Sequence, residues 1–331
     1  MLSFPPIGQI LKKTMPAYLP ITADRKVSGA DAALTYKPWW QRINLTAYTF
    51  LVPFLALFIL FRVYPFVVGI YTSFTNARIG RATETFIGLA NYTRALNSFE
   101  VRQAFANTAA YAMIVVPLTF FLSLAMAVYV NQKLPGHNLA RLVFFAPYVL
   151  SVSVVAIVWG WMFNAQFGLV NWTMGLFGLP DRTPWLADMS LVLPSIAFIT
   201  AWWTAGFSMV VFLGALQDIP HELIESARID GASGWQTFWR VIFPLLGPAS
   251  SLVLTLSTIE AFRVFSLMYI ITQGGPAGAS TSVVLLIFRE GFTYFNLGYA
   301  AAIGMLLFLV ILAVTIVRAV LFRGDLGYRH H

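Results

Sequence analysis

Six long apolar stretches constrain the fold of this chain more than any other feature. Each can supply the roughly 20 mostly apolar residues that a helix needs to cross a lipid bilayer. Hydrophobic residues make up 59% of the chain and charged residues only 10%. A soluble fold could not cover this much apolar surface, so the sequence predicts an all-α membrane protein with about six transmembrane helices. The predicted spans are Tyr48–Ser73, Phe105–Val130, Leu142–Phe163, Leu191–Leu216, Leu245–Ile271 and Leu297–Leu321.

Basic residues indicate which side of the membrane each segment faces. An even number of spans puts both termini on one side, and thirteen of the 21 Lys and Arg residues fall in the segments on that side. Six fall in the opposite segments, four of them in the first outer loop. Because cytoplasmic segments carry the excess of Lys and Arg, both termini are predicted to be cytoplasmic. The predicted domains are a cytoplasmic extension over 1–47, a membrane domain over 48–323 containing the loop 218–244, and a tail over 324–331.

Charge and residue types exclude several function classes. The net charge of +8 is not organised into a basic stripe with interleaved aromatics, so no nucleic-acid partner is predicted. The chain has no cysteine, and its four histidines form neither an HExxH pattern nor a triad. We therefore assign no catalytic residue, no metal ligand and no cofactor to this chain, which argues against a membrane enzyme.

The loop between the fourth and fifth predicted spans has a pattern of its own. Asp218 is a candidate cap for a helix that starts at Pro220, and Gly231 is a natural stop for it. Ser233 can then cap a second helix that ends at Pro244. Periodicity alone leaves open whether this is a functional element or an amphipathic helix that merely closes a loop.

The residues of this loop resemble a known motif. ESARIDGAS, followed by Phe238 and IFPLLGP, resembles the EAA motif of binding-protein-dependent ABC importer permeases, with Ser226 in place of the usual second Ala. FIGLANY, NTAAY, GGPAGAST and GYAAAIG resemble further segments of the carbohydrate branch, the maltose-transporter type. The resemblance thus extends over nearly the whole membrane region. The matching loop residues are Glu225, Ala227, Asp230, Gly231, Ala232, Phe238, Pro244 and Pro248.

This resemblance implies a type I importer permease fold with a cytoplasmic coupling helix in a bacterial inner membrane. The coupling helix would dock on a separate ATPase, and the chain itself has no GxxxxGK[ST] phosphate loop. ATP and Mg would therefore be bound by two partner ATPase subunits. Further implied partners are a second, homologous permease and an extracytoplasmic solute-binding protein. The residues expected to pass force from the ATPase are Glu225, Ser226, Ala227, Arg228, Asp230 and Gly231.

Polar residues inside predicted spans are the candidates for a substrate pathway. Glu260 and Arg263 are spaced i,i+3, so a buried and silent ion pair is one interpretation. The other interpretation is that these residues contact the substrate. It rests on the polar and aromatic residues that share one helix face and on the resemblance to maltose-type permeases, in which the fourth and fifth spans line a sugar pocket. Hydroxyl and carboxylate groups can bind sugar hydroxyls, and aromatic rings can stack on a sugar. The candidate pathway residues are Thr200, Trp203, Thr204, Phe207, Ser257, Glu260 and Arg263.

The cargo class follows from the resemblance, with alternatives. The expected cargo is a saccharide, either a neutral di- or oligosaccharide or a sugar acid that Arg263 could attract. One alternative is a permease for glycerol phosphate or another non-sugar solute. A second is an ion-coupled secondary transporter, which would need acidic residues in several spans, whereas Glu260 is the only one well inside a predicted span.

Overall fold

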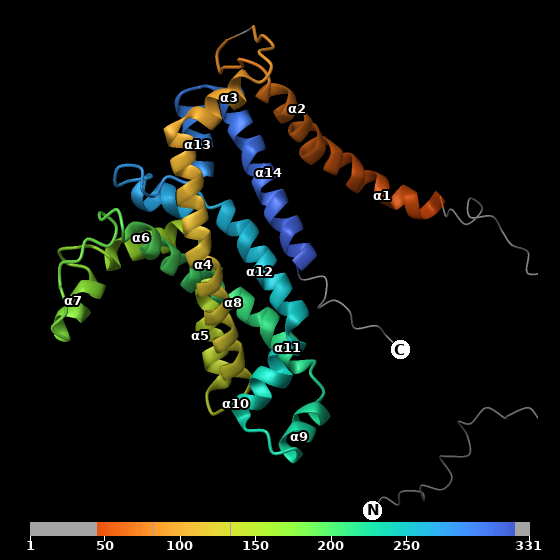
Figure 1. Ribbon diagram of the computed structural model, residues 1–331, viewed down its shortest axis with the longest axis vertical. Helices are drawn as coiled ribbons and strands as arrows, with labels where there is room; N and C mark the ends of the chain where they lie inside the picture. Colours follow the sequence, from red (N-terminus) through yellow and green to blue (C-terminus); the bar gives the residue numbers. More distant parts are fainter. Residues whose placement is uncertain (1–44, 82, 133, 322–331) are drawn as a thin grey trace, which may run out of the picture. The chain divides into compact units, whose positions relative to one another are not determined.

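The computed structural model describes residues 45–81, 83–132 and 134–321. The predicted tail and nearly all of the predicted extension lie outside the described residues. Within these ranges the chain is helical, and the only β-type pairing is an isolated antiparallel bridge between Thr75 and Phe86 (Figure 1). The chain divides into two compact units, 1–58 and 59–331. Helix α1 (Leu45–Phe58), which contains Pro53, is the described part of the first unit.

The candidate membrane spans are of two kinds. Four helical segments are unbroken and apolar enough to cross a membrane: Thr49–Ser73, Phe99–Asn131 (α4), Val192–Gln217 (α8) and Leu297–Val320 in α14 (Leu297–Leu321). Two bent pairs also qualify if each is one span: α5 (His137–Val149) with α6 (Val152–Met162), and Gly234–Leu245 with α12 (Gly247–Phe262). Across the described ranges this gives up to six spans, as the sequence predicts.

The third predicted span, Leu142–Phe163, is not one straight helix. α5 and α6 meet at an angle of 102°. Leu150 is extended, with φ −70° and ψ 143°, so the helix stops there. The Ser151 hydroxyl accepts a hydrogen bond from the Val154 amide at 3.4 Å and caps a new helix. The predicted span is therefore a broken one, and the hydropathy pattern does not reveal the break because the apolar run continues through this N-cap.

The fifth predicted span, Leu245–Ile271, is shorter than expected. α12 ends at Phe262, and the chain resumes helical geometry only before the π-helical turn η5 (Met268–Thr272). The Ser282 hydroxyl donates a hydrogen bond of 2.7 Å to the carbonyl of Val264, inside the interruption. A distant side chain thus satisfies a backbone group that a continuous helix would pair internally.

The second unit is built around α4 and α8, which pack along each other. α4 also contacts α12, α5 and α13 (Val283–Phe288), while α14 packs against α2 (Tyr64–Ser73), α13 and α3 (Ala90–Asn97). α5 and α8 approach closely at Gly206, where an added Cβ would lie 2.4 Å from the carbonyl oxygen of Phe144. Only glycine fits this crossing.

The buried residues form two clusters. Tyr111, Ile196 and Met268 belong to one, and Phe212 and Leu246 to the other. All five side chains are fully buried. Within this unit, α9 (His221–Ile229) and α10 (Gly234–Thr237) lie at one end and α3 at the other (Figure 1). α12 leads from the α10 end toward the middle of the unit.

Candidate functional site

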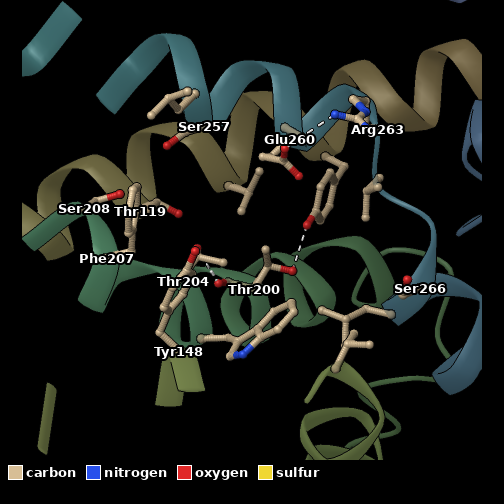
Figure 2. A pocket seen from close by; sticks show the side chains of 18 of the residues that line it. Thr119, Tyr148, Thr200, Thr204, Phe207, Ser208, Ser257, Glu260, Arg263 and Ser266 are labelled. Carbon is tan, nitrogen blue, oxygen red and sulfur yellow. Dashed lines mark hydrogen bonds and ion pairs between the residues drawn. The ribbon is translucent and has the colours of Figure 1, made fainter. Parts of the chain in front are cut away.

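A cavity of about 680 Å³ opens among the helices of the second unit (Figure 2). Its lining comes from α4, α5, α6, α8, α12 and the chain that follows α12. Helices far apart in the sequence therefore enclose a single space. The predicted pathway residues all line it: Thr200, Trp203, Thr204, Phe207, Ser257, Glu260 and Arg263.

Two interruptions of helical geometry border this cavity. Tyr148 and Val152 stand on either side of the break between α5 and α6, and both line it. Val264 and Phe265 form the interruption after α12 and line it as well. Irregular backbone at membrane depth is tolerated where it is buried in protein or lines a cavity. The cavity thus lies where the third and fifth predicted spans lose their helical continuity.

The polar wall on α8 is ordered by hydrogen bonds. The Thr204 hydroxyl donates to the carbonyl of Thr200 at 2.8 Å, and the Thr200 hydroxyl donates to the carbonyl of Ile196 at 2.9 Å. Tyr111, from α4, directs its hydroxyl to the Thr200 oxygen at 2.7 Å, one of the dashed contacts in Figure 2. Thr200 and Thr204 therefore present hydroxyl oxygens whose hydrogens are already donated.

The aromatic wall differs from the predicted one. Phe207 stacks on Tyr148, with ring centroids 5.3 Å apart and planes 25° apart. Trp203 was predicted only as a stacking ring, but its Nε1 donates to the carbonyl of Leu150 at 3.2 Å. Trp203 therefore also stabilises the break between α5 and α6, because Leu150 is the residue at which α5 ends.

The charged residues of the lining are Glu260 and Arg263. The expected i,i+3 pair is present, with the Arg263 Nη1 and Glu260 Oε1 atoms 3.8 Å apart. The interpretation of the pair as buried is wrong, since the Glu260 side chain is 76% exposed and that of Arg263 61% exposed. Arg263 also follows the last turn of α12, where a cation is favourable. Both charges face the cavity and are available to a ligand.

Tyr111 and Tyr148 are two aromatic residues of the lining that the sequence analysis did not select. Tyr111 lies in the second predicted span, within the NTAAY stretch, and Tyr148 directly follows Pro147. A proline followed after a few residues by a Ser cap was the available signal for a broken helix, and broken helices often border binding sites in transporters. No comparable signal in a single sequence pairs Tyr111 with Thr200.

The loop 218–244 contains the predicted glycine turn. Gly231 has φ +80°, and the amides of Gly231 and Ala232 bond to the carbonyls of Arg228 and Ala227, both at 3.0 Å. This pattern is a Schellman C-cap. The capping box of the second helix is also present, since the Ser233 amide bonds to the side chain of Gln236 at 2.9 Å.

Other details of this loop differ from the prediction. Asp218 ends α8 and makes no cap for α9, because the extended Pro220 occupies the N-cap position. The second helix continues past Pro244 to Leu245, through the π-helical turn η4 (Phe238–Ile242) and α11 (Phe243–Leu245). The described residues contain no ion pair between Glu225 and Arg228, although both are exposed on α9.

The end of this loop exposes apolar side chains beside charged ones. Ile229 is 86% exposed and Trp235 is 72% exposed. Ile224 and Phe238, by contrast, pack against the cluster that contains Phe212 and hold the loop on the helices. The candidate coupling residues lie around these exposed apolar groups: Glu225, Ser226, Arg228, Asp230 and Gly231 are exposed, and Ala227 is half-buried.

No group of three or more His, Asp or Glu side chains in the described ranges is placed to hold a metal ion. The cavity instead offers hydroxyl oxygens, aromatic faces, one carboxylate and one guanidinium. Such a surface is suited to binding a polar ligand.

Comparison with known proteins identifies similar chains. The family described as "Binding-protein-dependent transport system inner membrane component" matches residues 119–324. The trehalose/maltose transport system permease protein MalF of Thermococcus litoralis is 33% identical over 290 residues, which cover 87% of this chain and 96% of that protein. The sn-glycerol-3-phosphate transport system permease protein UgpA of Brucella suis is 30% identical over 82% of this chain and 92% of that protein.

Solved structures show the same fold. A chain of a bacterial ABC transporter involved in the import of the acidic polysaccharide alginate superposes with a TM-score of 0.75, at 22% identity. The match covers 86% of this chain and 98% of that one. A chain of a bacterial alginate ABC transporter, in complex with a periplasmic protein that carries an alginate pentasaccharide, also superposes with a TM-score of 0.75, at 22% identity.

Proposed function

The chain belongs to the family of binding-protein-dependent transport system inner membrane components, and we propose that it lines the path of a saccharide through an ATP-driven importer. The observation that carries this proposal is the cavity at the two interrupted helices. It lies among the candidate membrane-spanning helices, and the described residues place no metal-binding group of His, Asp or Glu there.

The cavity lining supports a sugar as the ligand. Sugars combine hydroxyl groups, which need hydrogen-bond partners, with apolar ring faces that pack on aromatic side chains. Thr200, Thr204 and Ser257 supply the first kind of contact, and Phe207 with Tyr148 supplies the second. We propose that the seven predicted pathway residues contact the sugar through such hydrogen bonds and ring packing.

We propose that the loop 218–244 couples the chain to separate ATPase subunits. The chain lacks a phosphate loop of its own, so ATP must act through a partner. Exposed apolar side chains such as Ile229 and Trp235, surrounded by polar residues, are typical of a protein–protein contact. This role puts the loop, and with it both termini, in the cytoplasm.

The complete importer that we propose contains further chains. Two ATPase subunits would bind ATP and Mg, a second permease subunit would complete the path, and an extracytoplasmic binding protein would deliver the cargo. The family description names binding-protein-dependent transport, and the alginate transporter is seen with its periplasmic protein. Both findings support the delivery step.

Uptake of radiolabelled maltose, trehalose and glycerol 3-phosphate into proteoliposomes tests the proposal. The importer is reconstituted from this chain together with a partner permease, ATPase subunits and a binding protein. Saccharide uptake that depends on ATP and on the binding protein is expected. Uptake of glycerol 3-phosphate without any saccharide would support the alternative suggested by UgpA.

A matched pair of variants tests the role of the cavity. Thr204→Val and Thr255→Val each remove a hydroxyl that donates to the carbonyl four residues earlier. Only Thr204 lines the cavity. We expect Thr204→Val to raise the sugar concentration at half-maximal uptake by about fivefold, equivalent to one lost hydrogen bond of roughly 1 kcal/mol. Equal effects of the two variants would contradict the assignment.

A further inference from the structure

We propose that the cavity selects an uncharged polyhydroxylated ligand, a neutral saccharide, over a carboxylated or phosphorylated one. This inference rests on the proposed function and narrows its cargo. It addresses the ambiguity raised by Arg263, which by itself would attract an anion. The argument depends on the charge balance of the lining and on the direction of its hydrogen bonds.

The charges of the lining cancel. Glu260 and Arg263 are its charged members, and they lie 3.8 Å apart as a pair (Figure 2). An anionic group that approached Arg263 would also approach the carboxylate of Glu260. Its attraction to the guanidinium would therefore be offset by repulsion. A neutral ligand meets no such opposition and can bond to both groups at once.

The hydroxyl groups on α8 favour ligands that donate hydrogen bonds. Thr204 and Thr200 donate their hydrogens to helix carbonyls at 2.8 and 2.9 Å, so their oxygens face the cavity as acceptors. A sugar hydroxyl can donate to such an oxygen. An ionised carboxylate or phosphate dianion has only acceptor atoms to offer there, so its oxygens would be set against other oxygens without a hydrogen between them.

Two polar donors near this wall are already used inside the protein. The Tyr111 hydroxyl donates to Thr200, and the Trp203 Nε1 donates to the carbonyl of Leu150. Arg263 is thus the one cationic residue of the lining, and its guanidinium lies beside the carboxylate of Glu260 (Figure 2). A pocket built for an anion usually gathers several donors, as Arg clusters and backbone amides do. This lining has a single cationic side chain, and its other free donors are neutral hydroxyl groups such as those of Thr119, Ser257 and Ser266.

The aromatic residues add to the same preference. Phe207 and Tyr148 present a stacked pair beside the acceptor wall of Thr204 (Figure 2). The C–H faces of a neutral sugar ring can pack on such rings while its hydroxyls reach the threonine oxygens. Binding a carboxylate at the same place would remove its hydration and supply only neutral hydroxyl donors, such as that of Tyr148, in exchange.

Saturation-transfer NMR on the reconstituted importer, without its binding protein, tests the inference directly. The probes are cellobiose and a matched disaccharide in which one ring is a glucuronate. We expect the wild-type complex to bind cellobiose at least tenfold more tightly than the uronate. Glu260→Gln leaves Arg263 without its partner and should reduce this preference about tenfold, whereas Arg263→Gln should increase it.

Glu84→Gln is the matched control, because Glu84 is an exposed acid in the loop before α3 and does not line the cavity. The control should keep the wild-type preference. Tighter binding of the uronate by the wild type, or an unchanged preference in Glu260→Gln, would overturn the inference while leaving a saccharide importer intact. Binding of neither disaccharide, together with uptake of no saccharide, would overturn the proposed function as well.

Discussion

Replacing Gly231 by alanine should loosen the turn between α9 and α10. Gly231 has φ +80°, a region that costs an L-residue about 1–2 kcal/mol. A Cβ at this position would meet no atom within 4 Å, so the cost is one of backbone conformation and not of packing. A penalty of this size changes the ratio of closed to open turn by a factor of roughly 5–30.

Hydrogen exchange at the two capping amides measures this effect. The amides of residues 231 and 232 bond to the carbonyls of Arg228 and Ala227 only while the turn is closed. Gly231→Ala should speed the hydrogen exchange of these two amides by a factor of up to roughly 30. ATP-driven uptake by the reconstituted importer should fall in parallel, while membrane insertion stays unchanged, because α9 would no longer be held in one orientation.

Two companion variants separate the backbone effect from other causes. Gly231→Asn should largely restore slow exchange and uptake, since asparagine tolerates the left-handed region. Gly234→Ala should change neither, because Gly234 is helical and an added Cβ there also meets nothing within 4 Å. If Gly234→Ala were as harmful as Gly231→Ala, or if asparagine failed to rescue, the reasoning from φ would be refuted.

Three further variants test the cavity and its surroundings. Trp203→Phe keeps an aromatic ring but loses the hydrogen bond from Nε1 to the Leu150 carbonyl. We expect it to impair uptake nearly as much as Trp203→Ala, and uptake kinetics of both variants test this expectation. Ser151→Ala removes the hydroxyl that accepts a hydrogen bond from the Val154 amide and caps α6. This change should lower the free energy of unfolding by about 1 kcal/mol, which thermal denaturation measures. Hydrogen bonds from Ser190, and from the Leu191 amide, lower the pKa of Asp188. The stabilisation from this carboxylate is therefore present above the ordinary aspartate pKa of about 4 and is lost as the pH falls through the lowered value. Asp188→Asn should therefore reduce the acid sensitivity of tryptophan fluorescence in the purified protein.

The sequence was sufficient to locate the spans but not their interruptions. An average over about 20 residues detects an apolar run whether or not the backbone turns within it. Ser151 could have been recognised as an N-cap, because Ser caps are a local signal. The interruption after α12 could not, since the hydroxyl that bonds to Val264 comes from Ser282, beyond the next loop.

Helical periodicity predicted which residues line the cavity better than it predicted their hydrogen-bond partners. Placing Thr200, Thr204 and Phe207 on one face of a helix needs only a spacing of three or four residues. The spacing does not say that Tyr111 bonds to Thr200 or that Trp203 bonds to Leu150. Those contacts depend on which helices pack together, which is a property of the tertiary fold.

α12 connects the loop 218–244 to the cavity. Its 16 residues begin at Gly247, after a bend of 68° from the loop helices, and end at Phe262 beside Glu260 and Arg263. A helix of this length spans about 24 Å and its hydrogen bonds resist compression. A displacement of the loop must therefore be passed to the Glu260–Arg263 pair or absorbed at the bend. The loop can change what the cavity presents to a ligand without any chemistry of its own.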